Sequence, residues 1–340
     1  MDQGYKILFC DDIDIVADFY ENSWSPAPFK KNREWLNWMM YSNPHVKIGT
    51  PPIIIAMSND VLVGHLMAYP SLMWIAGKSF EFAWIHNLYV SPEHRRNKIG
   101  TSLMDFAADV FGTVIGSGQS STTDIIQNKY AWSTISQQIQ YETILPSKSL
   151  VSDGSKPSLY RISRRLIAMI WGECIRGLKK RNIAIHRRDS FSSGVESLWD
   201  TIKNSDIIVS DRSRDALMWR FSKHPYYKYD IYEAEDNSGN IAAYVVVRYF
   251  ENTCIIVDYL SVKDIKFLIS LILKICHDAK NKNCLRVVFN GLSILMANAL
   301  SSCGFIKTSS GQFFRMHPSS VLSFSNSLIQ FTAFDSDIDR

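Results

Sequence analysis

An internal repeat constrains the architecture of this chain more than any other feature of its sequence. Tryptophan and proline recur with the same spacing in Trp38-Met-Met-Tyr-Ser-Asn-Pro44 and in Trp219-Arg-Phe-Ser-Lys-His-Pro225. Each copy follows a short strand and a helix, and precedes β-rich segments joined by a polar turn. Because a repeated unit decides the architecture, we predict two domains of one type. A residue that both copies keep is expected to serve packing.

The repeat sets the predicted domain boundaries. Residues 1–150 form the first domain and residues 182–318 the second. The predicted fold class is α/β, and each domain has a mixed, mostly antiparallel sheet flanked by helices. Residues 151–181 are predicted to be a linker that contains a basic amphipathic helix. Residues 319–340, which are rich in Ser and Asp, are predicted to be an irregular tail.

The linker helix leaves one alternative open. Residues 159–180 carry basic side chains around an apolar stripe. Such a helix can lie on an anionic membrane surface, or it can bury its apolar stripe between two domains. We favour the second interpretation, because tandem domains need a connector.

Composition excludes several classes of protein. The 340 residues include 46% hydrophobic and 21% charged residues, as in an ordinary globular chain. The net charge of +4 suits an anionic ligand but is too small to indicate nucleic acid. The six cysteines contain no CxxC pair, so they predict neither a disulfide framework nor a metal site. The chain shows no signal peptide and no apolar run of the roughly 20 residues that span a bilayer, so we expect a cytoplasmic protein.

The segment that carries chemistry lies between residues 80 and 112. Its parts are the strand Phe80–Val90, the break Ser91–His94, the basic loop Arg95–Gly100 and the helix Thr101–Phe111. A strand, a basic loop and a helix N-terminus form an anion-binding arrangement, because free N–H groups and the positive helix end point at one place. We predict that a diphosphate binds there and that Gly100 lets it approach the backbone closely.

These residues resemble the signature of the Gcn5-related N-acetyltransferase (GNAT) superfamily. That signature is an apolar-aromatic-Val strand end, then x-Pro-x-x-(Arg/Gln)-x-x-Gly-x-(Gly/Ala), then a helix. The matching residues are Leu88, Tyr89, Val90, Pro92, Arg95 and Gly100. Lys98 departs from the pattern, because it stands where the first glycine belongs. The order of elements extends the resemblance over residues 5–145, and the second domain resembles a degenerate copy without the basic loop.

The resemblance implies two tandem GNAT-like domains, of which the first binds acetyl-CoA or another acyl-CoA as co-substrate, without a metal. It implies that backbone groups of Leu88, Tyr89 and Val90 hold the pantetheine arm. It also implies that the pyrophosphate lies against the loop residues Arg95, Arg96, Asn97, Lys98, Ile99, Gly100 and Thr101.

Acyl transfer to an amine needs a base that removes a proton. Enzymes of the family use a Glu on or near the central strand and a Tyr near a later helix. Here Glu81 and His86 are the candidates for the base, and Tyr130 and Tyr141 are the candidates for the acid. The alternative for each is structural, as a half-buried His, a solvated Glu at a strand end, and core or rim tyrosines.

We therefore predict an N-acyltransferase that moves an acetyl or other acyl group to a primary amine of a small acceptor. An amino sugar or nucleotide-linked sugar of surface polysaccharide is the expected acceptor class, and no nucleic acid is expected as a partner. One alternative is a Fem-like transferase that uses aminoacyl-tRNA, which should show a broader basic face. The other is a non-catalytic binding module. Binding of CoA to the loop discriminates between these alternatives.

Overall fold

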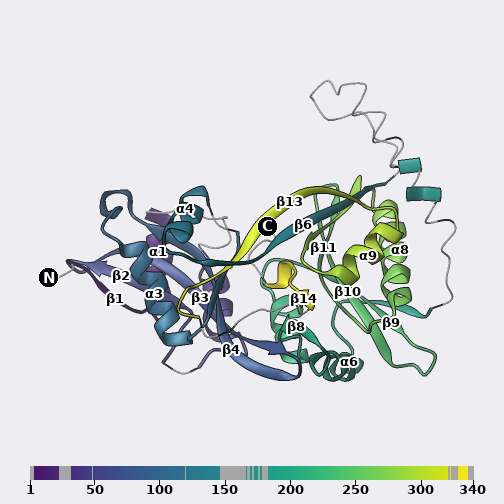
Figure 1. Ribbon diagram of the computed structural model, residues 1–340, viewed down its shortest axis with the longest axis horizontal. Helices are drawn as coiled ribbons and strands as arrows, with labels where there is room; N and C mark the ends of the chain where they lie inside the picture. The colour runs from purple at the N-terminus through teal and green to yellow at the C-terminus, as the bar shows by residue number, and fades with distance from the viewer. Residues whose placement is uncertain are drawn as a thin grey trace.

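One continuous mixed β-sheet runs the length of the molecule (Figure 1). A computed structural model describes residues 4–22, 32–47, 49–118, 120–145, 166, 169–170, 172–174, 177, 183–320, 322 and 328–335. We call the part up to residue 145 the first half and the part from residue 183 the second half. The strands follow the order β1-β2-β3-β4-β5-β13-β6-β12-β11-β10-β9-β7, while β8 pairs with β3 and with β14. The predicted α/β class with a mixed sheet is confirmed.

The first half consists of strands that form the sheet and of helices that cover its two faces. The strands are β1 (Lys6–Phe9), β2 (Ile53–Ser58), β3 (Val61–Ile75), β4 (Lys78–Val90), β5 (Val114–Gly116) and β6 (Ser133–Ile144). The helices are α1 (Ile13–Asn22), α2 (Arg33–Tyr41), the short 3₁₀ helix η2 (Pro92–His94), α3 (Ile99–Phe111) and α4 (Ser121–Lys129). Alternate residues of β3 and β4 pack on α1 and α2 on one face and on α3 on the other.

The second half has a similar sequence of elements. Its strands are β7 (Ile185–Arg188), β8 (Ile207–Ser210), β9 (Asp230–Glu235), β10 (Ile241–Phe250), β11 (Thr253–Ser261), β12 (Arg286–Gly291), β13 (Ile306–Met316) and β14 (Leu328–Gln330). Its helices are α6 (Gly194–Lys203), α7 (Arg214–Leu217), the π-helical turn η3 (Met218–Ser222), α8 (Ile265–Asn281), α9 (Ile294–Ser302) and η4 (Ala333–Asp335).

The same pattern of strand pairing occurs in both halves. In the first half β1 to β4 pair antiparallel in order, and β4 then pairs parallel with β5. In the second half β7, β9, β10 and β11 pair antiparallel, and β11 then pairs parallel with β12. At the centre the halves exchange a strand, because β6 pairs with β12 and β13 pairs with β5. Each half of the sheet is therefore completed by a strand from the other half (Figure 1).

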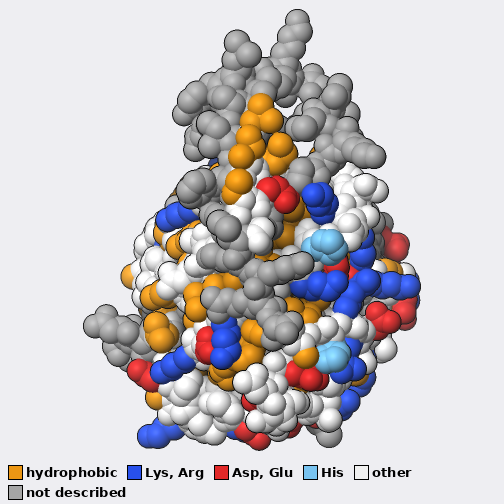
Figure 2. Space-filling model, turned by 90° about the vertical axis from the view of Figure 1, so that its right-hand side faces the viewer, with side chains coloured by type: hydrophobic (Ala, Val, Ile, Leu, Met, Phe, Trp, Pro, Cys, Tyr) orange, Lys and Arg blue, Asp and Glu red, His pale blue; other side chains and the backbone are white. Residues whose placement is uncertain are grey.

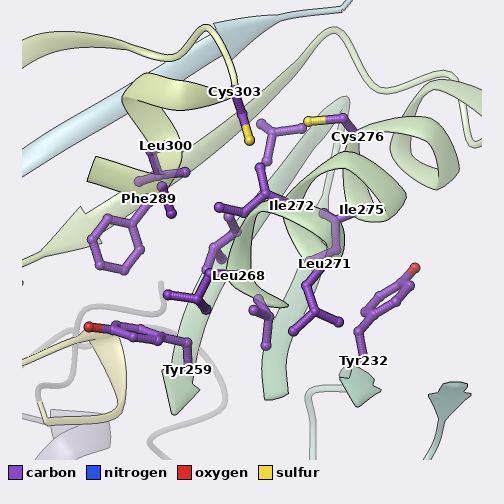
Figure 3. Packing of buried hydrophobic residues seen from close by; sticks show 14 of the residues in the cluster. Tyr232, Tyr259, Leu268, Leu271, Ile272, Ile275, Cys276, Phe289, Leu300 and Cys303 are labelled. Atoms are coloured by element: carbon purple, nitrogen blue, oxygen red, sulfur yellow. The ribbon is translucent and has the colours of Figure 1, made fainter. Parts of the chain in front are cut away.

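The core of the second half shows why α8 covers the sheet. Leu268, Leu271, Ile272 and Ile275 recur at helical spacing and form one fully buried stripe of α8 (Figure 3). The stripe packs in one cluster with Phe289 of β12 and with residues of β10 and β11. Burial of such a stripe holds this helix on the sheet because it removes apolar surface from water.

The repeated tryptophans meet each other where the two halves join. The rings of Trp38 and Trp219 are stacked, with centroids 5.0 Å apart and an interplanar angle of 17°. The indole N–H of Trp38 donates to the carbonyl of Trp219 at 3.1 Å, and that of Trp219 donates to the carbonyl of Trp38 at 3.4 Å. Both side chains are buried. The two copies therefore make a reciprocal contact, and packing accounts for the repetition.

The end of the chain differs from the predicted irregular tail. Of residues 319–340, the structure places Leu328–Gln330 in β14 and Ala333–Asp335 in η4. Asp335 is fully buried and accepts hydrogen bonds from the guanidinium of Arg212 at 3.0 and 2.7 Å. The sequence pattern did not show this, because a buried ion pair between distant residues leaves no local signal.

The structure describes only part of the predicted linker. Residues 166, 169–170, 172–174 and 177 are helical, and the rest of 151–181 lies outside the described residues. Within the described part of the chain, no helix is both long enough and apolar enough to cross a membrane.

Candidate functional site

The parallel strands β4 and β5 separate after a short stretch of pairing. The paired residues are Ala83–Val114, Trp84–Ile115 and Ile85–Gly116. Just beyond them β4 contains a bulge, in which Asn87 and Leu88 oppose a single residue of β3. Asn87 has φ of 53°, and such a bulge bends the strand. One edge of β4 pairs with β3, and the other pairs with β5 only up to Ile85. Among the described residues, no strand pairs with this second edge between His86 and Val90.

A tight loop leads from the end of β4 into α3. Arg96 and Lys98 have positive φ angles of 74° and 61°, which are uncommon for residues with a β-carbon. Lys98 stands where the GNAT signature has its first glycine, and it adopts the left-handed conformation that glycine adopts without steric cost. The backbone at this position is therefore one that suits glycine, although the chain has lysine there.

Replacing Lys98 by glycine should raise the stability of the protein by about 1 kcal/mol, because the left-handed strain is relieved. If the ammonium group contacts a phosphate, the same change should weaken acyl-CoA binding about tenfold. Lys98→Ala is the matched control, since it removes the ammonium group and keeps the strain. Chemical unfolding and calorimetric titration measure the two effects. Equal stability of the glycine and alanine variants would contradict the strain argument.

The N-terminus of α3 carries no negative group. Helices α2, α4, α7, α8 and α9 each begin with a side chain that accepts a hydrogen bond from their first turn. Helix α6 lacks such a cap but has Glu196 in its first turn. Helix α3 has neither a side-chain cap nor an acidic residue there. The exposed side chains of Arg95, Arg96 and Lys98 precede it, so this helix end attracts anions.

Two residues shape the entrance to α3. Nε of Arg95 donates to the carbonyl of Val90 at 3.0 Å, so this side chain fastens the loop to the end of β4. Gly100 lies in the first turn of α3, which begins at Ile99 rather than at the predicted Thr101. Ile99 is buried, which explains why the helix starts there. A β-carbon at Gly100 would lie 3.7 Å from the side chains of Leu88 and Val90, so the protein itself tolerates a larger residue there.

His86 lies beside the point where β4 and β5 separate. Its side chain is buried, and its ring stacks on Tyr69 with centroids 4.9 Å apart. Tyr69 belongs to the cluster that packs under α1 and α2, whereas Leu88 and Val90 pack with α3. His86 therefore occupies the sheet face opposite to α3.

The other candidates for proton transfer occupy three different places. Glu81 is exposed and pairs with Lys47 at 2.6 Å. Tyr130 follows α4 and packs against the same cluster as Leu88 and Val90. Tyr141 pairs with Phe289 of β12, eight residues and roughly 26 Å along β6 from Ser133. Of these three, the structure brings only Tyr130 into the cluster at the strand separation.

Ser117 also lies at the strand separation, and the sequence pattern did not single it out. It directly follows β5 and would oppose His86 if the parallel pairing continued. It is 8% exposed, and its hydroxyl has no hydrogen-bond partner among the described residues. The only signal in the sequence is a polar residue at the end of a short apolar strand.

The comparison with protein families bears on this geometry. Residues 13–125 match the model of the Acetyltransferase (GNAT) family. This part of the chain is therefore similar to that family. It includes β4, the basic loop and α3, so the resemblance inferred from the loop residues is confirmed for residues 13–125. A search of curated proteins gives no match.

The likeness of fold to solved structures extends beyond the residues that match the family model. A probable N-acyltransferase from Enterococcus faecalis V583 has a TM-score of 0.60 at 13% identity, covering 92% of this chain and 71% of that chain. N-myristoyltransferase from Saccharomyces cerevisiae, solved with myristoyl-CoA bound, has a TM-score of 0.57 at 13% identity, covering 93% and 83%. A GCN5-related N-acetyltransferase from Kribbella flavida has a TM-score of 0.58 at 13% identity, covering 92% and 70%. The likeness of fold to these N-acyltransferases therefore extends over both halves of the chain.

Proposed function

We propose that this protein is an N-acyltransferase that moves an acyl group from acyl-CoA to a primary amine. The observation that carries the proposal is the uncapped, basic N-terminus of α3 directly beyond the separation of β4 and β5. Its amides, from Asn97 to Thr101, suit a pyrophosphate. The backbone of β4 at Leu88 to Val90, beyond its pairing with β5, suits the amides of a pantetheine arm, which would bind as an added strand does.

The groups around the strand separation match the steps of acyl transfer. The amine attacks the thioester carbonyl carbon, and the carbon–sulfur bond then breaks. We assign His86 as the base that takes the proton of the amine, because it lies two residues before Leu88. Backbone N–H groups of β4 would polarise the thioester carbonyl. We assign Tyr130 to protonate the leaving thiolate, because it packs on the same cluster as Leu88 and Val90.

We propose that the second half is a degenerate GNAT-like copy that supports the first. The strand pairing repeats in it, but α8, which follows β11 as α3 follows β4, begins at the acidic cap Asp264. The space beside β11 is also occupied. The side chain of Gln330 donates to the carbonyl of Tyr259 at 2.7 Å, and Phe331 pairs with Leu292. Because Asp264 is acidic, it disfavours the binding of a diphosphate at the start of α8.

The acceptor is proposed to be small and to approach on the face of His86. Aromatic side chains line that face, since Tyr69 stacks on His86 and also contacts Trp219, with centroids 6.3 Å apart. Such rings suit the apolar face of a sugar, in keeping with an amino sugar or nucleotide-linked sugar. The proposed setting for this reaction is the cytoplasm.

The aminoacyl-tRNA alternative expects a broad basic face. Figure 2 shows the outer face of the second half, where Lys and Arg lie among Asp and Glu. Several charged side chains of the second half form ion pairs, such as Arg187 and Lys282 with Asp230 and Arg188 with the buried Glu233. Basic side chains that are paired in this way attract a polyanion less strongly than unpaired ones would.

Replacing His86 by glutamine should lower turnover by about 10²- to 10⁴-fold while acyl-CoA affinity stays unchanged, since only the base is lost. The assay follows release of the CoA thiol from acetyl-CoA with a panel of amino sugars, and calorimetry measures affinity. Unchanged turnover would exclude His86 as the base. A wild-type protein that binds neither acetyl-CoA nor a longer acyl-CoA would contradict the whole proposal and favour the binding-module alternative.

A further inference from the structure

Buried arginines provide an internal comparison in this protein. Among the described residues, four arginines are at most 6% exposed, namely Arg212, Arg220, Arg248 and Arg315. Three of them have acceptors. Arg212 binds Asp258 and Asp335, Arg220 donates to the carbonyl of Ala333, and Arg315 binds Asp124 and Asn128. Arg248 differs, because no described residue accepts a hydrogen bond from its guanidinium.

Arg248 lies on β10, where it pairs in register with Ile255 of β11. Its side chain is on the face that packs under α6, since Tyr244 and Val246 of the same strand belong to that cluster. The residue is 2% exposed. The guanidinium carbon lies 4.1 Å from the centroid of the Tyr227 ring. This contact supports the charged group, but it leaves the N–H groups at the guanidinium edge without acceptors.

The atoms left without acceptors are Nε and Nη2. These two nitrogens form one edge of the guanidinium, and their N–H bonds point the same way. That edge is the fork that binds a carboxylate or a phosphate with two parallel hydrogen bonds. A buried cation is strongly unfavourable unless an anion compensates it. The shape and the charge of the unsatisfied group therefore specify the same ligand chemistry.

We propose that Arg248 anchors a second anion site, which binds a carboxylate or phosphate group of a small molecule. The Tyr227 ring that supports Arg248 stacks on His224 at 4.9 Å, and His224 contacts Trp38 at 4.6 Å. Successive ring contacts thus connect Arg248 to Trp38 at the junction of the two halves. This site lies in the second half and is separate from the loop before α3, so it stands whether or not acyl-CoA binds there.

Replacing Arg248 by methionine tests the proposal through thermal melting at constant ionic strength. In chloride alone, the methionine variant should melt above the wild type, because an uncompensated buried charge is removed. Adding inorganic phosphate or acetate should raise the melting temperature of the wild type by about 2–4 °C and leave that of the variant unchanged. A response to phosphate alone, or to acetate alone, identifies which group is bound.

Two further variants serve as controls for this experiment. Arg248→Lys retains the charge and loses the fork, so its response to the anion should be smaller than that of the wild type. Arg315→Met breaks a buried pair, so it should melt below the wild type in every buffer and keep the anion response. If Arg248→Met also melts lower in chloride, then Arg248 has an acceptor within the protein and the proposal is wrong. An anion response that is equal in wild type and Arg248→Met, or absent from both, overturns it as well.

Discussion

Replacing Gly100 by glutamate is expected to raise the dissociation constant for acetyl-CoA at least about a hundredfold, or about 2.7 kcal/mol. The carboxylate would enter the first turn of α3, where the proposed pyrophosphate meets the free amides. Two negative groups would then compete for one positive helix end. The β-carbon itself fits, because it would lie 3.7 Å from Leu88 and Val90.

The same substitution should not destabilise the protein. An acidic side chain at a helix N-terminus interacts favourably with the helix dipole, by about 0.3–1 kcal/mol. Loss of binding without loss of stability would therefore separate a ligand effect from misfolding. Calorimetric titration and thermal melting measure the two quantities on the same preparation.

Val110→Glu is the matched control for this experiment. Val110 is 40% exposed and lies in the last turn of the same helix, far from the loop. It receives the same change in charge and should bind acetyl-CoA like the wild type. If Gly100→Glu binds like the wild type too, the cofactor does not lie at the start of α3.

Replacing Asp335 by asparagine is expected to destabilise the protein by about 3–5 kcal/mol, because it breaks a buried ion pair in which both carboxylate oxygens accept from Arg212. Both side chains are fully buried. Asp335 also accepts a hydrogen bond from the backbone N–H of Thr332 at 2.8 Å. Nε of Arg212 lies 3.1 Å from a carboxylate oxygen of Asp258, so two acids share one guanidinium. Burial raises the pKa of the Asp258 carboxyl, and the guanidinium opposes this shift.

Urea unfolding of the full-length chain measures the effect. Asp200→Asn is the matched control, because Asp200 is 57% exposed and forms a surface pair with Lys203. That change should stay within about 0.5 kcal/mol of the wild type. Adding Arg212→Met to Asp335→Asn should destabilise the protein further, since it leaves the buried carboxylate of Asp258 without its cation. A cost below about 1 kcal/mol for Asp335→Asn would show that the network contributes little.

The sequence alone was sufficient to predict the secondary structure of that part of the candidate site whose residues are consecutive along the chain. The strand end at Leu88 to Val90, the basic loop and the start of α3 are consecutive, so their composition specifies strand, turn and helix in order. Lys98 stands in place of the first glycine of the signature, yet its backbone is left-handed, as glycine favours. The repeat around Trp38 and Trp219 could be recognised in the sequence for the same reason, since the spacing of its residues is local in each copy.

Only the tertiary structure decided which distant residues meet. Tyr130 and Tyr141 were equivalent in the sequence, but the exchange of β6 and β13 carries Tyr141 into the second half. The pairing of Arg212 with Asp335 joins residues far apart along the chain. The lack of an acceptor for Nε and Nη2 of Arg248 among the described residues is likewise evident only in three dimensions. Local patterns record the period of a strand or helix, whereas burial and compensation of charge depend on partners that the chain brings together only when it folds.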